Sequence, residues 1–208
     1  KLMINFMGFA PKWMGIKLIK PEYEDEYIEM IISFFHYALK TRHLQFGLIA
    51  PTNESDHHNY AEGPHLSGEQ HARIIRKLID RMEALEIMGN IRIVAPDNAS
   101  TEKSIKDFVP ALMEDPVIMS KVAHFGFHSY GGHYPGLENF FQKSGYPAAS
   151  LWVTEWNAWC KGCDDGILGE YNYEFAAKCV TYLLDLIQHG ASAGIAWEAY
   201  DSYYEHHA

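Results

Sequence analysis

Apolar runs of strand length alternate with longer amphipathic segments along the chain. The apolar runs cover residues 2–9, 44–50, 91–95, 122–127, 151–153 and 193–197. Turn-forming residues such as Gly, Pro, Asn and Asp end most of these runs. A short apolar run that is bounded by turn residues is typical of a buried strand. The pattern therefore predicts six strands.

The segments between the runs place apolar residues at helical spacing. The apolar face of the segment 21–40 consists of Tyr27, Ile28, Ile31, Ile32, Phe35 and Leu39. Ser67 and Gln70 form a capping box, which predicts a helix that begins there and continues to about Leu85. Further helices are predicted at 101–113, 137–143 and 170–189.

Strands that alternate with helices predict βα units and a parallel sheet, either an open doubly wound sheet or a (β/α)8 barrel. No glycine-rich phosphate loop follows the first strand, so a nucleotide-binding sheet has little support. The polar and aromatic residues at successive strand ends are Trp13, Asn53, Glu54, Asp97, His128, Tyr130, Glu155 and Trp197. Polar and aromatic residues at the ends of many strands favour the barrel, because an open sheet would gather its site at a single switch point. We expect an α/β fold, an incomplete (β/α)8 TIM barrel with about six βα units.

Length, composition and charge narrow the function classes. The chain has 208 residues, of which 48% are hydrophobic and 21% charged, as expected for one globular domain. A formal net charge of -10 argues against a nucleic-acid partner, which would require a basic face. No apolar run is long enough to span a bilayer. We expect residues 1–208 to form a single catalytic domain without a membrane span.

The termini and the cysteines leave the compartment open. The chain starts at Lys1 and shows no signal-peptide pattern. The location is therefore left open, with a weak preference for a secreted or extracytoplasmic protein. Cys160 and Cys163 form a C-x-x-C motif that could be a disulfide, half of a metal site or a redox pair. A disulfide that braces the loop, or two free thiols, fits best because a zinc site would need a second pair. We expect no cofactor and no metal.

Two glutamates follow strands that would lie three units apart in a barrel, facing one another across its mouth. They are Glu54, after Asn53, and Glu155, after Thr154. Such a carboxylate pair suits glycoside hydrolysis, with one nucleophile and one proton donor. A separation of roughly 5 Å predicts retention, and roughly 6.5–9.5 Å predicts inversion. Tryptophans and tyrosines at the same rim would supply flat apolar surfaces for sugar rings.

These residues resemble clan A of the glycoside hydrolases, the retaining (β/α)8 enzymes with cellulase-like, glucosylceramidase-like and xylanase-like families. The resemblance covers essentially the whole chain. It rests on Phe9–Met14 at a third strand, Pro51–Glu54 at a fourth, His128–Tyr130 at a sixth, Thr154–Trp156 at a seventh and Ala196–Trp197 at an eighth. It implies a retaining β-glycoside hydrolase that acts on an oligosaccharide or polysaccharide.

The resemblance also implies a role for each matching residue. Glu54 would be the acid/base and Glu155 the nucleophile, while Asn53 would bind the sugar 2-hydroxyl. Tyr130 would orient the nucleophile. Further substrate contacts would come from His128, Trp197 as the floor of the subsite at the cleaved bond, Trp13 and Trp156. Glu54 would have to stay protonated near neutral pH and Glu155 ionised.

The chain departs from the family pattern in two respects. Ser55 replaces the proline that often follows the Asn-Glu pair. Strands one and two have no counterpart, and the chain stops soon after strand eight. A six-strand arc would leave parallel edges unpaired. We therefore expect the N-terminal βα units and the C-terminal end of the domain to be missing, and the remainder of its own barrel to be a partner.

Two other functions compete with the glycosidase. The first is an inactive carbohydrate-binding barrel. The second is a metal-dependent hydrolase that uses the histidine-rich loop, but the spacing of His57, His58, His65 and His71 fits no zinc pattern. A third carboxylate, Glu198, should point away from the sugar if Trp197 faces it. The loops 56–65 and 160–169 are expected to determine substrate selectivity.

Overall fold

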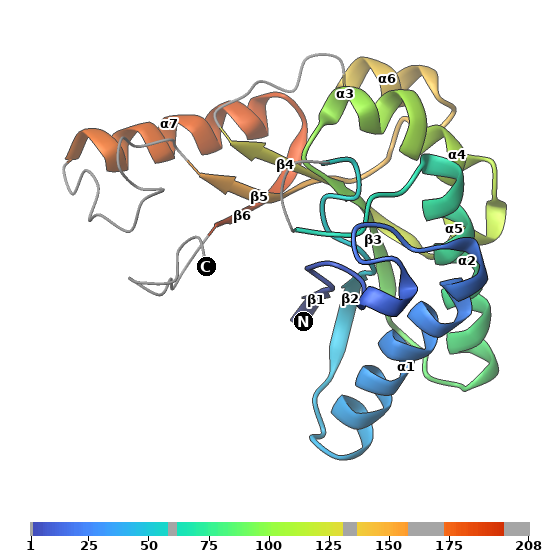
Figure 1. The fold of residues 1–208 in the computed structure, drawn as a ribbon. Coiled ribbons are helices and arrows are strands. Elements are labelled where there is room, and N and C mark those ends of the chain that lie inside the picture. Colours follow the sequence, from blue (N-terminus) through green and yellow to red (C-terminus); the bar gives the residue numbers. More distant parts are fainter. Residues whose placement is uncertain (1, 58–61, 131–136, 158–172, 198–208) are drawn as a thin grey trace. The chain divides into compact units, whose positions relative to one another are not determined.

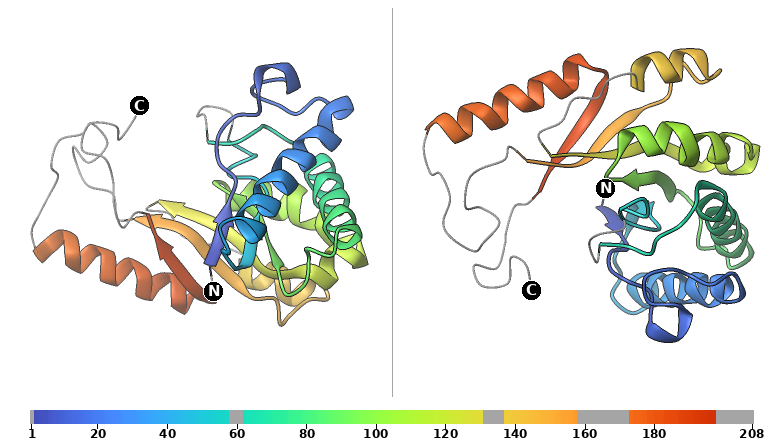
Figure 2. Two further views of the ribbon diagram at one scale, coloured as in Figure 1. Left: turned by 90° about the horizontal axis from the view of Figure 1, so that it is seen from below. Right: turned by 45° about the horizontal axis from the view of Figure 1, so that its top comes forward.

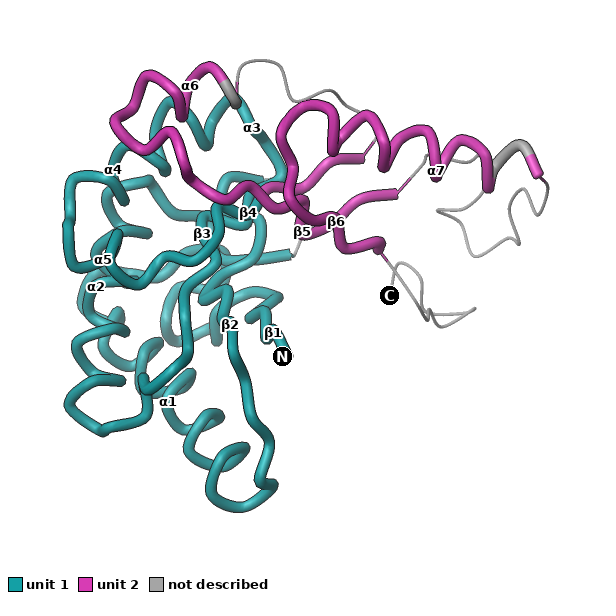
Figure 3. The backbone as a smooth tube through the Cα atoms, turned by 180° about the vertical axis from the view of Figure 1, so that it is seen from behind, with its two compact units in different colours: residues 1–126 teal, residues 127–208 magenta. Residues whose placement is uncertain are grey.

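The computed structural model describes residues 2–57, 62–130, 137–157 and 173–197. Within it the chain divides into two compact units, Lys1–Gly126 and Phe127–Ala208, which Figure 3 shows in different colours. The boundary falls inside the fourth strand. Each unit is therefore described by itself, and the single domain expected for residues 1–208 stays a prediction.

Unit 1 alternates strands with helices as its sequence predicts. Its elements are β1 (Leu2–Asn5), η1 (Lys12–Met14), η2 (Pro21–Tyr23), α1 (Glu24–Lys40), β2 (Phe46–Ala50), α2 (Gly68–Ala84), β3 (Arg92–Asn98), α3 (Thr101–Lys103), η3 (Ser104–Phe108), α4 (Val109–Met113) and α5 (Pro116–Lys121). β1 pairs with β2 and β2 with β3, both in parallel. Each parallel pair is joined by a helical connection, as βα units require.

β4 (Val122–Tyr130) crosses the boundary, and unit 2 continues with α6 (Leu137–Lys143), β5 (Leu151–Asn157), α7 (Tyr173–Gln188) and β6 (Ala191–Ala196). β5 and β6 are parallel. The strands follow one another in chain order in the sheet, β1-β2-β3-β4-β5-β6 (Figure 1). This confirms the fold class predicted from the sequence, an incomplete (β/α)8 barrel with six strands in the described part of the chain.

The core of unit 1 lies between its strands and the apolar faces of α1 and α2. The predicted face of α1 is buried at Tyr27, Ile28, Ile31, Ile32 and Phe35, although Leu39 is only half-buried. α2 buries Ile74, Ile75, Leu78, Ile79 and Met82 completely. Burying one such side chain stabilises the fold by roughly 1.5–3 kcal/mol. The two helices lie side by side in Figure 1 and Figure 2.

An ion pair between a buried carboxylate and a half-exposed guanidinium joins α1 to α2. Glu24 is 1% exposed, and the Arg73 guanidinium donates to its carboxylate at 2.7 and 3.0 Å. The predicted N-cap is confirmed, since Ser67 Oγ accepts from the Gln70 backbone N–H at 3.2 Å. The Gln70 side chain does not complete the capping box, because it donates to Ile19 O and to Glu24 Oε1 instead.

The predicted helix at 101–113 is interrupted. α3 leads into η3, a π-helical turn over Ser104–Phe108, before α4 resumes α-helical geometry. Pro110 stands in the first turn of α4. Proline has no backbone N–H, so an uninterrupted α-helix would lack the hydrogen bond from residue 110 to the carbonyl four residues earlier. Asp115 then caps α5 by accepting from Val117 N and Ile118 N at 2.8 and 3.3 Å.

In unit 2, α7 packs closely onto β6 at a glycine. A Cβ at Gly194 would lie 2.9 Å from Leu183 Cδ1 and 3.0 Å from Trp156 Nε1, so a larger residue would require these two side chains to shift. Another face of α7 exposes Val180, Leu184 and Ile187. No helix among the described residues is both long and apolar enough to cross a membrane.

Candidate active site

Three neighbouring strands of unit 1 bring polar side chains together at their carboxyl ends. Asn5 ends β1, and its Nδ2 donates to Asn53 Oδ1 after β2 and to Asp97 Oδ2 in β3, both at 2.8 Å. Asn53 and Asp97 are 1% and 0% exposed. The carboxyl ends of parallel strands are where barrel enzymes place their chemistry. One amide thus links the three strand ends.

Glu54 follows Asn53 in a strained backbone conformation. Its φ of 42° is left-handed, and so is that of Asp97 at 61°. The Glu54 N–H donates to Asp97 O at 2.9 Å, which holds the chain in place at this point. The residue is 7% exposed. Such strain, at a nearly buried carboxylate, is typical of functional sites.

Residues 54–57 form a tight turn that is anchored to the end of β3. The His57 N–H donates to Glu54 O at 2.8 Å and closes the turn. The Asp56 carboxylate accepts from Ala99 N at 3.0 Å and Ser100 N at 2.7 Å. Burial raises the pKa of the Asp56 carboxyl, although these N–H groups oppose the shift. The turn brings His57 Nδ1 to 3.4 Å from Glu54 Oε2.

The Asn53 side chain and backbone are both held tightly. Its Nδ2 donates to Glu62 O at 3.3 Å, and the Glu62 carbonyl also accepts from Gly8 N at 2.8 Å. A Cβ at Gly63 would lie 1.6 Å from Asn53 O, so the backbone at 63 can approach only because it is glycine. Asn53 is therefore positioned by β1 and by the segment at 62–63.

In unit 2, the Glu155 carboxylate receives two partners from the end of β4. Tyr130 Oη donates to Glu155 Oε2 at 2.6 Å, and His128 Nδ1 lies 3.4 Å from the same oxygen. Glu155 and His128 are 7% and 2% exposed, whereas Tyr130 is half exposed. A donated O–H stabilises an ionised carboxylate. The Tyr130 hydroxyl thus favours the ionised form of Glu155 that the resemblance implies.

Side chains alternate between the two faces of β4 and β5, so Glu155 and its two partners lie on the face opposite to the one that packs against α7. Ser129 bonds the hydroxyl of Tyr182 on α7, and Trp156 packs on the ring of Tyr182 with centroids 6.1 Å apart. Successive residues of a strand face opposite sides. Trp156 thus lies on the α7 side, and Glu155 on the opposite side with His128 and Tyr130. This contact favours a packing role for Trp156 over the expected stacking on sugar.

The other two tryptophans of the prediction are partly exposed. Trp197 follows β6, where its backbone N–H donates to Trp156 O at 2.8 Å and its backbone carbonyl accepts from Asn157 Nδ2 at 2.7 Å. Trp197 is 36% exposed. Trp13 lies in η1 against Tyr23, with ring centroids 5.5 Å apart, and is 55% exposed. Both residues are therefore partly exposed in the described structure.

Several predicted features stay predictions. Glu54 and Asn53 belong to unit 1, whereas Glu155 and its partners belong to unit 2, so the pairing of the two glutamates rests on the sequence argument. His58, Cys160, Cys163 and Glu198 lie outside the described residues.

The histidines of the proposed metal loop have different surroundings. His57 lies beside Glu54, His65 packs on Phe9 and His71 is buried against Phe108. Burial lowers the pKa of His71 to about 3. In the ranges that the structure describes, these histidines form no group of metal-binding size. The described part of this loop therefore does not assemble the histidine site that the metal-dependent hydrolase would use.

Sequence reasoning missed Asn5 and the contact of His57 with Glu54. A lone polar residue interrupts the apolar run 2–9 at Asn5, and this was the available signal. His57 stands three residues after Glu54, a spacing that a tight turn converts into a side-chain contact. It was considered only as a metal ligand.

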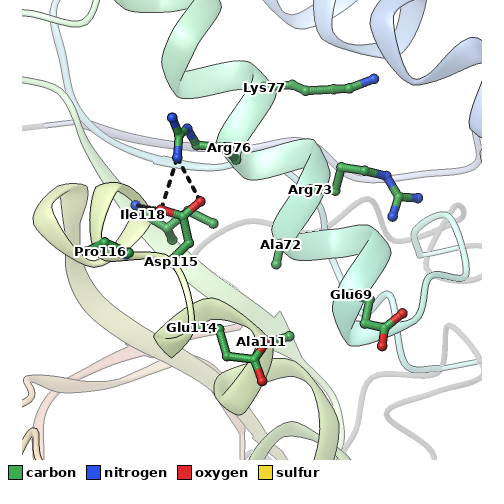
Figure 4. Close-up of a pocket in the computed structure, with 10 residues that line it drawn as sticks. All are labelled: Glu69, Ala72, Arg73, Arg76, Lys77, Ala111, Glu114, Asp115, Pro116 and Ile118. Atoms are coloured by element: carbon green, nitrogen blue, oxygen red, sulfur yellow. Dashed lines mark hydrogen bonds and ion pairs between the residues drawn. The ribbon is translucent and has the colours of Figure 1, made fainter.

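A pocket on the helical layer of unit 1 is a weaker candidate. It lies between α2 and the α4–α5 segment, with an apolar floor that includes Ala72 and Ile118 (Figure 4). Arg76 on its rim is paired with Asp115 at 2.9 Å, and Arg73 with Glu24 at 2.7 Å. Lys77 is likewise paired, with Asp25 and Glu24, so the cations of the pocket are already neutralised by carboxylates.

No model of a known protein family matches the sequence, and no curated protein matches it. Solved structures do. An endo-β1,6-glucanase matches 90% of this chain with a TM-score of 0.69 and 19% identity, and 43% of its own chain is covered. A GH30 endoxylanase from Clostridium papyrosolvens C71 matches 95% of this chain with a TM-score of 0.61 and 17% identity, over 46% of its own chain.

A GH39 β-xylosidase from Caulobacter crescentus matches 87% of this chain with a TM-score of 0.62 and 17% identity, over 40% of its own length. The chain thus spans less than half of each of these structures. At this identity the likeness establishes the fold. The chain has the fold of clan A glycoside hydrolases over part of their barrel, as the sequence predicted.

Proposed function

We propose that this chain is part of a retaining β-glycoside hydrolase, with Glu155 as nucleophile and Glu54 as acid/base. The observation that supports this most is the environment of Glu155. A nearly buried carboxylate at a strand end accepts the Tyr130 hydroxyl at 2.6 Å, with His128 beside it. The fold, shared with structures named as a glucanase, an endoxylanase and a β-xylosidase, agrees with this function.

In the first step Glu155 attacks the anomeric carbon of the sugar. The glycosidic C–O bond breaks as the new C–O bond to Glu155 forms, and Glu54 transfers its proton to the leaving oxygen. The electron pair of the broken bond stays on that oxygen. Tyr130 donates its hydroxyl to Oε2 of Glu155, and Oε1 is the proposed attacking oxygen. It also fixes the orientation of the nucleophile.

In the second step water releases the sugar from Glu155. Glu54, now a carboxylate, accepts the water proton while the water oxygen attacks the same anomeric carbon. The bond to Glu155 breaks, and the two inversions together retain the anomeric configuration. Asn53, His128, Trp13 and Trp197 are proposed substrate contacts, with the exposed indoles as stacking surfaces. Trp156 is omitted because it packs on Tyr182.

The test uses a panel of dinitrophenyl and phenyl β-glycosides of glucose, xylose and galactose and of their β-linked disaccharides. Glu155→Ala should abolish hydrolysis, and azide should restore turnover with an α-glycosyl azide as product, because azide then inverts the centre once. Glu54→Ala with azide should give the β-glycosyl azide, because azide attacks the covalent intermediate and inverts a second time. Glu26→Ala, at an exposed position of α1, serves as a control for loss of a carboxylate.

The outcomes separate this function from its main alternative. A wild-type protein that binds β-glycans but turns over none of the panel would be an inactive carbohydrate-binding barrel. Hydrolysis that survives Glu155→Ala, or azide products of the opposite configuration, would refute the assigned roles.

A further inference from the structure

We propose that His57 is a positioning residue for Glu54. Its imidazole donates a hydrogen bond to the Glu54 carboxylate and stabilises the negative charge that forms there when Glu54 gives up its proton. This inference rests on the proposed function, in which Glu54 is the acid/base. It gives a role to a histidine that the sequence suggested only as a metal ligand.

The contact joins a nearly buried acid to a partly exposed histidine. His57 Nδ1 lies 3.4 Å from Glu54 Oε2, where the side chains are 33% and 9% exposed. Nδ1 carries a proton in one neutral tautomer and in the imidazolium, so it can donate without being charged. The other oxygen of Glu54, Oε1, is then the one from which a proton reaches the leaving group.

The backbone holds the two side chains at this separation. His57 N donates to Glu54 O, which makes residues 54–57 one turn. The turn is fixed at Asp56, whose carboxylate accepts two N–H bonds and whose carbonyl accepts Lys103 Nζ at 2.6 Å. The geometry of the pair therefore does not depend on the side chains alone. A preorganised donor of this kind costs little reorganisation during the reaction.

The donated bond gains strength as the reaction proceeds. Glu54 begins the first step as a carboxylic acid and ends it as a carboxylate, after its proton has moved to the glycosidic oxygen. A hydrogen bond to an ionised acceptor is stronger than one to a neutral acceptor. An interaction that is stronger in the transition state than in the ground state increases the rate. His57 would therefore accelerate the steps in which the leaving oxygen needs a proton.

The leaving group makes this role measurable. A dinitrophenolate leaves without a proton, whereas a phenolate leaves slowly unless Glu54 protonates it. Loss of the His57 donor should lower kcat/KM for phenyl glycosides about tenfold and leave kcat/KM for dinitrophenyl glycosides nearly unchanged. A purely structural disturbance would lower both values alike.

The experiment compares four variants of the full-length protein on both leaving groups. His57→Leu removes the donor, while His57→Asn keeps an N–H close to the position of Nδ1 and should restore most of the rate. Glu54→Gln sets the pattern for complete loss of the acid. His36→Leu, at an exposed position of α1, is the matched control. Thermal melting of each variant shows that it folds.

The results distinguish the two proposals. If Glu54→Gln slows phenyl glycosides selectively but His57→Leu slows both leaving groups alike, or neither, the role of His57 is refuted while the proposed function stands. The same holds if His57→Asn is as slow as His57→Leu. If the wild type has no activity on any glycoside, the proposed function fails, and the role of His57 fails with it.

Discussion

Tyr130 Oη donates a hydrogen bond of 2.6 Å to Glu155 Oε2, which connects the last residue of β4 to the carboxylate of β5. His128, two residues earlier on the same face of β4, approaches the same oxygen at 3.4 Å. Two side chains of one strand thus define the direction of one carboxylate. This relationship depends on strand alternation and on the neighbouring positions of β4 and β5.

Replacement of Tyr130 by phenylalanine should lower activity more than stability. The ring would remain, but Glu155 would lose a donor that orients it and stabilises its charge. We expect kcat to fall by about 10- to 100-fold, because a hydrogen bond to a charged group contributes roughly 1.5–3 kcal/mol. Steady-state kinetics on an aryl β-glycoside would measure this. Tyr146→Phe, at an exposed position, is the control, and equal activity of Tyr130→Phe and wild type would contradict the prediction.

Replacement of Asn5 by leucine should destabilise unit 1. Asn53 Oδ1 and Asp97 Oδ2 would both lose the donor that they share, and Asp97 is completely buried. A buried polar group without a partner costs about 1–3 kcal/mol. Urea denaturation should show a decrease in the free energy of unfolding of this size. Asn139→Leu, exposed on α6, should change it by less than about 0.5 kcal/mol.

Replacement of Gly63 by alanine tests the close approach to Asn53. The new methyl group would lie 1.6 Å from Asn53 O, so the backbone would have to move. We expect a loss of stability above about 2 kcal/mol, since overpacking typically costs 1–3 kcal/mol. Gly89→Ala separates sterics from backbone strain, because Gly89 has a φ of 42° but open space around it. That variant should cost only about 1 kcal/mol. Similar losses for both variants would exclude the steric explanation.

The buried histidine of α2 should make the folded state sensitive to acid. Burial lowers the pKa of His71 from 6.5 to about 3, so between these values the unfolded chain binds a proton that the folded chain excludes. Above pH 6.5 His71 is neutral in both states and does not lower the free energy of unfolding. As the pH drops from 6.5 toward 3, protonation of His71 in the unfolded chain lowers this free energy progressively. The slope is at most about 1.4 kcal/mol per pH unit.

His71→Leu should remove this contribution to the slope. The measurement is the free energy of unfolding at pH 7, 5.5 and 4.5 for wild type and variant. The difference between the two proteins should shift in favour of the variant as the pH decreases. A difference that is independent of pH would show that His71 titrates normally in the folded protein.

The order of strands and helices follows from the sequence because burial imposes it. The apolar faces of α1 and α2 could be read from spacing alone, since each face must contact the sheet. The interruption between α3 and α4 could not, because the pattern of apolar residues continues across it. There the π-helical turn before Pro110 depends on backbone hydrogen bonding that periodicity does not encode.

The residues of the candidate site could be named where a polar side chain stands at the end of an apolar strand, and their catalytic roles stay a proposal. Glu54, Glu155 and Tyr130 could be named in this way, and the contact of Tyr130 with Glu155 lies where the resemblance placed it. The resemblance implied that Trp156, which follows Glu155, contacts the substrate. Adjacent strand residues face opposite sides, and the structure directs this indole to Tyr182. Asn5 was missed because its importance arises from two partners that lie 48 and 92 residues further along the chain.

The left-handed backbone at Glu54 and Asp97 has a consequence for how the sequence would change over evolutionary time. Each such residue costs the fold on the order of 1 kcal/mol or more. Glycine would remove this cost at both positions, and asparagine would reduce it. Homologues under selection for the carboxylates should therefore keep them despite the strain. Lineages in which that selection has relaxed should drift toward glycine or asparagine at these sites, so that the residue at position 54 would report whether a related chain is still under selection for its acid.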